Sequence, residues 1–230
     1  MQFVLNKNYL DYESKALLYY LQEYNWFYKL GYNVTYPDNP IFDDILNKAK
    51  SNSLNDNDLN NIKNKLSQIS SEEEYNKIYD SCELIILEIN IILDQYKNIF
   101  IEMNKNFDFK LFKNYNIEIT KYGPGGSYNP SDGTILIKWR NNNLNKSTLI
   151  HELFHIGIEE SIIQKYNINH ETKEYIVDMF VKSNFSKEFS DYYIQSINDQ
   201  NVDVFIKEYI NEKFNWNELD NLLKSKKLNL

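Results

Sequence analysis

The residues with the clearest chemical potential are in the stretch HELFH, at positions 151 to 155. It contains two of the only three histidines in a chain of 230 residues, His151 and His155, and the third, His170, follows a short distance downstream. On an α-helix, residues four positions apart lie on one face, with Cβ atoms about 6 Å apart. The two imidazoles can therefore each direct a nitrogen at one metal ion, at about 2.0–2.1 Å if the ion is zinc.

Glu152 occupies the next position round the same predicted helix. From there its carboxylate can reach a water molecule on the metal without becoming a ligand itself. This is the HExxH arrangement, in which the acid takes a proton from the attacking water and passes it to the leaving group. The sequence therefore predicts Glu152 as a catalytic general base.

A catalytic zinc site also needs a third protein ligand and one open position. Eighteen residues separate His155 from Glu174, and Asp178 lies one helical turn beyond Glu174. Glu174 can complete the ligand set, and Asp178 can accept the outer N–H of a ligand imidazole and fix its tautomer. His170, one turn before Glu174, is the alternative third ligand or a hydrogen-bond donor to the oxyanion of the transition state.

This pattern resembles that of the gluzincins, a group of zinc metallopeptidases that includes thermolysin and the zinc aminopeptidases. In that group HExxH is followed, after a spacer of this length, by a glutamate ligand with an aspartate four positions later. The resemblance covers about thirty residues and leaves the subfamily open. It implies His151, His155 and Glu174 as zinc ligands, Glu152 as general base and Asp178 as the partner of His151. It also implies a zincin layout, with an edge strand near the metal that holds an extended peptide.

Three other interpretations remain open. In the first, HELFH belongs to an apolar helix that merely tolerates two histidines, but unpaired imidazoles and a carboxylate there would cost about a few kcal/mol of desolvation. In the second, zinc stabilises a non-catalytic binding or regulatory protein through a closed site with His170 as fourth ligand. In the third, the protein is a metallopeptidase-like regulator or toxin with one dedicated protein target.

The elements that must position these residues are mostly helical. Apolar residues at helical spacing predict a helix that stops at Gly31, and Ser71 followed by three glutamates predicts an N-cap. Helices are expected at residues 11–29, 42–50, 59–69, 72–104, 148–166 and 170–182, with two or three more after residue 186 that use Trp216 and Leu219 as anchors.

Two segments in the middle of the chain predict strands. Residues 116–122 (NIEITKY) and 134–139 (TILIKW) alternate with period two and are rich in β-branched residues, so we expect them to pair. The intervening GPGGSYNPSDG lacks the GK[ST] ending of a phosphate loop and predicts a flexible turn beside a binding cleft. The predicted fold class is α+β, mostly helical with a small β-sheet next to a two-helix metal site. We expect a helical N-terminal region (1–106) and a zincin-like site region with C-terminal helices (107–230) to form one compact unit.

The composition of the chain limits the classes of partner that we expect it to bind. A net charge of −8 and a pI near 5.0, with no dense run of Lys and Arg, argue against a nucleic-acid partner. Cys82 is the single cysteine, which excludes an intrachain disulfide and a cysteine-based zinc cluster. The most apolar run, residues 84–93, is about half the length of a membrane span, and the N-terminus lacks the apolar core of a signal peptide. We expect a cytoplasmic protein that acts on a peptide or protein, without a membrane partner.

Further side chains are candidates for the oxyanion donor. Besides His170, these are Tyr128, Arg140 and Tyr166, and the sequence does not choose among them. Glu159 and Glu160 are predicted to form a solvated face of the helix.

Overall fold

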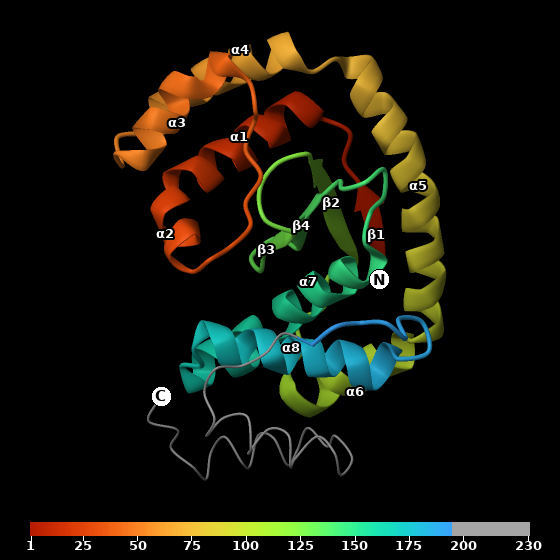
Figure 1. Ribbon diagram of the computed structural model, residues 1–230. Helices are drawn as coiled ribbons and strands as arrows, with labels where there is room; N and C mark the ends of the chain where they lie inside the picture. The colour runs from red at the N-terminus through yellow and green to blue at the C-terminus, as the bar shows by residue number, and fades with distance from the viewer. Residues whose placement is uncertain (195–230) are drawn as a thin grey trace.

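The computed structural model describes residues 1–194, apart from the side chains of residues 106 and 107 (Figure 1). Within this range the chain is mostly helical with one small four-stranded sheet, so the predicted α+β class is confirmed. The predicted anchors Trp216 and Leu219 lie outside the described residues.

Eight α-helices cover most of the described chain, and all six helices predicted before residue 186 are present. Two of them are divided, at Glu23 and at Tyr96, and the predicted helix 148–166 continues after Ile158 as a π-helical turn, Glu159–Gln164. The α-helices are α1 (Tyr9–Gln22), α2 (Tyr24–Lys29), α3 (Asp43–Lys50), α4 (Leu59–Ile69), α5 (Glu72–Gln95), α6 (Lys97–Phe107), α7 (Lys146–Ile158) and α8 (His170–Phe185).

The sheet has the order β1-β2-β4-β3. Its strands are β1 (Gln2–Leu5), β2 (Asn114–Thr120), β3 (Gly126–Asn129) and β4 (Thr134–Lys138). The predicted pairing of β2 with β4 is confirmed and is parallel, with Ile117 opposite Ile135. After β2 the chain runs past the position of β4 to form the edge strand β3, and a turn then brings it back as β4, antiparallel to β3.

Two strands were not predicted. β1 pairs in parallel with β2 across the predicted division of the chain at residue 106. The prediction of a flexible turn at residues 123–133 was wrong, because the middle of this segment forms the strand β3. Only its ends turn, where Gly123 and Gly133 have φ values of +91° and +75°, a conformation that glycine adopts without strain.

The helices cover both faces of the sheet. Helix α1 contacts β2, α7 contacts β3 and β4, and α5 runs alongside β1 (Figure 1). One large hydrophobic cluster joins the sheet to α5–α8, and a smaller one lies among α1, α3 and α4. The sheet thus fixes α7, the helix that carries HELFH, against the core.

A buried carboxylate links the two sides of the molecule. Glu13 of α1 accepts hydrogen bonds from Thr120 Oγ1 at 2.7 Å, from the backbone N–H of Lys121 at 3.1 Å and from the Tyr75 hydroxyl at 2.7 Å. A buried carboxylate is tolerated when its lone pairs are satisfied in this way. Glu13 therefore ties α1 to α5 and to the end of β2.

No helix among residues 1–194 combines the length and the apolar character that crossing a membrane requires.

Candidate metal centre

An N-cap and apolar packing hold helix α7 in place, independently of His151, Glu152 and His155. The Asn145 side chain caps it by accepting a hydrogen bond from the backbone N–H of Ser147 at 3.0 Å, and every residue from Leu149 to Ile158 is buried. At Gly157 the Phe109 ring packs so closely that an added Cβ would lie 1.9 Å from its Cζ atom. The backbone that carries the two histidines therefore has little freedom to move.

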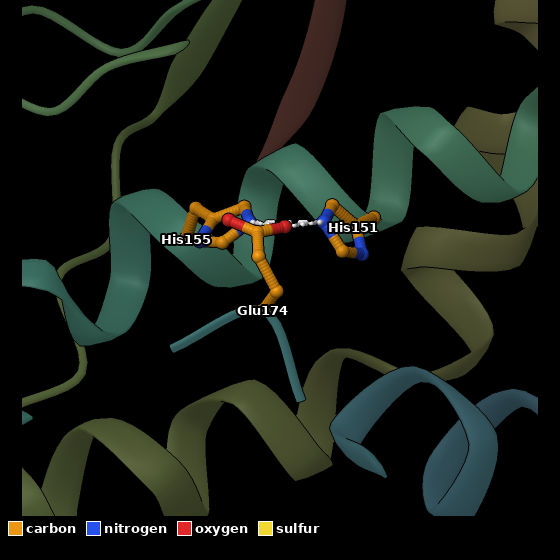
Figure 2. Close-up of side chains that lie close together, drawn as sticks. All are labelled: His151, His155 and Glu174. Carbon is orange, nitrogen blue, oxygen red and sulfur yellow. Dashed lines mark hydrogen bonds and ion pairs between the residues drawn. The ribbon is translucent and has the colours of Figure 1, made fainter. Parts of the chain in front are cut away.

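The structure brings the three predicted ligands together (Figure 2). The Nε2 atoms of His151 and His155 lie 2.9 Å apart, and Glu174 Oε2 lies 3.2 Å from the first and 3.3 Å from the second. The histidines come from α7 and the carboxylate from α8, which packs beside it. The three donor atoms thus form a nearly equilateral triangle.

This triangle has the size that a tetrahedral metal site requires. Bonds of about 2.0–2.1 Å at tetrahedral angles separate neighbouring ligand atoms by about 3.3 Å. The observed separations of 2.9, 3.2 and 3.3 Å are close to that value. The donor set, two imidazoles and one carboxylate, also fits zinc. His151, His155 and Glu174 would hold the ion, with one position free for a further ligand.

Electrostatics at the triangle favour a cation. Burial opposes a charge on His151, but its bonds to Asp178 and Glu174 outweigh burial and raise its pKa to about 10. Burial likewise opposes a charge on Glu174, yet its hydrogen bonds with both histidines hold its pKa well below the usual range. A positive charge is therefore stabilised on His151, whereas burial and then that charge lower the pKa of His155 to about 4. One cation is thus favoured beside Glu174, and a metal ion would take the place of that proton.

Asp178 lies where the sequence predicts, behind His151. Its Oδ1 atom is 3.1 Å from His151 Nδ1, so the imidazole can donate its outer N–H to this carboxylate and direct Nε2 at the triangle. The Tyr192 hydroxyl joins the same pair, 2.7 Å from His151 Nδ1 and 2.6 Å from Asp178 Oδ1. Tyr192 was not predicted, because the sequence pattern of the site ends at Asp178.

His155 is oriented by stacking instead. The Tyr128 ring lies parallel to its imidazole, with centroids 4.8 Å apart and an interplanar angle of 4°. Within residues 1–194, His155 Nδ1 has no hydrogen-bond partner, so the ring contact is what fixes the plane of the imidazole.

Glu152 is 6% exposed, and no group in the described part of the chain donates a hydrogen bond to its carboxylate. Burial raises its pKa to about 7, an effect that the neighbouring His151 charge reduces. Gly126 of β3 lies directly against it, because a Cβ at Gly126 would be 2.3 Å from Glu152 Oε1. A carboxylate without a fixed partner, with a pKa near neutrality, suits proton transfer.

His170 lies outside the triangle. Its Nδ1 is 3.6 Å from Glu174 Oε1, whereas Oε2 is the oxygen that contacts His151 and His155, and its Nε2 is hydrogen-bonded to the Tyr32 hydroxyl. The structure thus places His170 beside the third ligand. Tyr32 follows α2 and is far away in the sequence, so no spacing pattern could predict this contact.

These residues line one open cleft of about 1230 Å³. Three of the four candidate oxyanion donors line it (Tyr128, Arg140 and His170), whereas Tyr166 does not.

The prediction that Glu159 forms part of a solvated helix face was wrong. Glu159 lines the cleft and accepts a hydrogen bond of 2.7 Å from the Tyr128 hydroxyl. The π-helical turn begins at Glu159, directly after α7. Glu160 is exposed, as predicted, and pairs with Lys110.

Comparisons with models of known protein families, with curated proteins and with solved structures gave no match for this chain. Any assignment of function therefore depends on the geometry of the site itself.

Proposed function

We propose that this protein is a zinc-dependent peptidase that hydrolyses a peptide bond in the cleft between β3, α7 and α8. The observation that carries the proposal is the triangle of donor atoms from His151, His155 and Glu174, with the buried Glu152 carboxylate beside it, which has no hydrogen-bond partner among residues 1–194. The resemblance of HExxH…ExxxD to the gluzincin pattern supports the same assignment.

Each residue of the site has a separate role in the proposed reaction. His151, His155 and Glu174 would bind zinc, which when bound supplies a Lewis acid that polarises a carbonyl and acidifies water. Glu152 accepts a proton from the attacking water and delivers it to the departing amine, for which its pKa of about 7 is suited. Asp178 and Tyr192 hold the imidazole of His151 in position.

His170 is our choice for the group that donates a hydrogen bond to the oxyanion. It lines the cleft next to Glu174, and the Tyr32 hydroxyl restrains its ring. Such donors are effective when they are fixed before the reaction begins. A peptide or protein substrate and a cytoplasmic location complete the proposal.

The experiment that tests the proposal is the substitution Glu152→Gln. The amide has nearly the same shape but cannot accept the proton, so zinc content should stay at the wild-type level while cleavage of a peptide library falls by about 10²-fold or more. Zinc content is measured by elemental analysis and cleavage by mass spectrometry of the digest. Cleavage by E152Q at the wild-type rate would remove Glu152 from the mechanism, and a wild-type protein that binds zinc but cleaves nothing would refute the peptidase assignment.

A further inference from the structure

One stretch of the residues that line the cleft carries only positive charge. The lining residues between 124 and 148 include three cationic side chains (Lys138, Arg140 and Lys146) and no acid, although the protein as a whole has a net charge of −8. Among the described residues, the acidic side chains of the lining come from α7, α8 and the segments that follow each of them, and α8 also contributes Lys173. Lys138 belongs to β4, Arg140 to the loop after it and Lys146 to the start of α7.

Two of these cations have no anionic partner among the described residues. Lys138 is 8% exposed, and its Nζ donates to Thr35 Oγ1 and, at 3.0 Å, to the carbonyl oxygen of Gly123. Arg140 is exposed, and its guanidinium reaches only the carbonyl oxygen of Pro124, at 3.5 Å. Lysine is rarely buried without a carboxylate partner. Lys146, by contrast, already pairs with Glu88.

The surroundings of Lys138 and Arg140 add to the positive potential. Burial and then the nearby Arg140 charge together lower the pKa of Lys138 to about 8, because neighbouring like charges repel each other. The N-terminus of α7, which lines the same part of the cleft, carries a partial positive charge from its unpaired N–H groups. An anion bound here would relieve this repulsion.

We propose that Lys138 and Arg140 form a subsite for a carboxylate of the substrate, either an acidic side chain or the C-terminus of a peptide. This inference rests on the proposed function, because it takes the ligand of the cleft to be a peptide. Its location follows from the sheet. Gly126 touches Glu152, and Pro124, which contacts Arg140, precedes Gly126 by two residues. The subsite therefore lies beside the start of β3, next to the residue that touches Glu152.

The test is a binding measurement that does not need catalysis. Fluorescein-labelled peptide mixtures are titrated onto zinc-loaded E152Q in matched pairs: Asp against Asn within the chain, and a free against an amidated C-terminus. Salt at about 0.15 M screens long-range charge effects. We expect one carboxylate form to bind about tenfold more tightly than its neutral partner, and the pair that shows the difference identifies which carboxylate is bound.

The variants R140Q and K138M, each made in E152Q, should abolish this preference, whereas the matched control K146M should keep it. Circular dichroism checks folding, and R140Q alone is sufficient if the buried Lys138 cannot be replaced. Equal affinity for both members of each pair, no binding of any peptide, or an equal loss of preference in K146M would overturn the subsite. A carboxylate preference in a wild-type protein that cleaves no peptide would instead refute the peptidase and leave the subsite standing.

Discussion

At the scale of single residues, each donor of the triangle is oriented by a different neighbour. His151 is held by Asp178 and the Tyr192 hydroxyl, His155 by the face of Tyr128, and Glu174 by both imidazoles. Contacts of this kind fix the direction of the lone pairs before any ion arrives. The affinity of the site should therefore depend on residues that do not touch the metal.

Asp178→Asn tests that dependence. The amide cannot accept the imidazole N–H as strongly as the carboxylate does, so zinc affinity should fall about 10- to 100-fold. Competition with a chromogenic chelator measures it. Tyr192→Phe, which removes only the hydroxyl, should have a smaller effect in the same direction, and Tyr193→Phe, an exposed neighbour, should have none. Unchanged zinc affinity in a folded D178N protein would show that Asp178 does not orient the ligand.

Glu118 provides a prediction about pH. Burial, and then the nearby Asp132, raise its pKa to about 7 from an ordinary value of 4.5. The folded state therefore holds this proton more tightly than the unfolded state, so Glu118 lowers the free energy of unfolding as the pH rises from about 4.5 to above 7. Because the side chain is partly exposed, we expect Glu118→Gln to be more stable than wild type by about 1–2 kcal/mol at pH 8 and equal to it at pH 4.5. Urea unfolding at the two pH values measures the difference, and a gain at pH 4.5 of the same size would contradict this explanation.

At the scale of elements, prediction from the sequence succeeded where a pattern repeats and failed where it is too short to repeat. The helical spacing around Leu17 persists over several turns, and Ser71 caps a long helix whose apolar spacing also repeats. The alternation in residues 116–122 covers most of a strand. β1 and β3 have only four residues each, too few for alternation to be recognised. β3 also lies among glycines and prolines, and only its pairing with β4 holds it extended.

The strand β3 gives the sharpest test of how an element positions a catalytic group. An added methyl group in Gly126→Ala would displace the Glu152 carboxylate, so peptide cleavage should fall by about 10²-fold while zinc content is retained. Gly125→Ala is the matched control, because a Cβ there meets nothing within 4 Å. Rates of peptide cleavage for the two variants, measured side by side, decide the question. Equal activity of G126A and G125A would show that contact with β3 does not position Glu152.

At the scale of the whole molecule, the cleft combines parts of the chain that are far apart in the sequence. Tyr32 reaches His170 across 138 positions, and Tyr192 reaches His151 across 41. The sequence predicted the triangle because its members lie on two neighbouring helices at fixed spacing. It could not predict Tyr32, Tyr192 or Glu159, whose positions depend on how the helices pack.

The packing also predicts the response to chelation. The triangle borders an open cleft, whereas the described part of the fold is held by three hydrophobic clusters and by Glu13. Treatment with EDTA should therefore abolish peptide cleavage and leave the far-UV circular dichroism unchanged, and added zinc should restore cleavage. Loss of helical signal on chelation would instead favour a structural zinc in a non-catalytic protein.

The central claim is that three side chains on α7 and α8 hold one zinc ion, and elemental analysis of purified protein tests it most directly. After zinc loading and dialysis, wild type and E152Q should each contain one zinc per chain, because Glu152 is not a ligand. Glu174→Ala should contain little, because the two remaining imidazoles leave the triangle open. Wild-type protein without zinc, or E174A with as much zinc as wild type, would contradict the account.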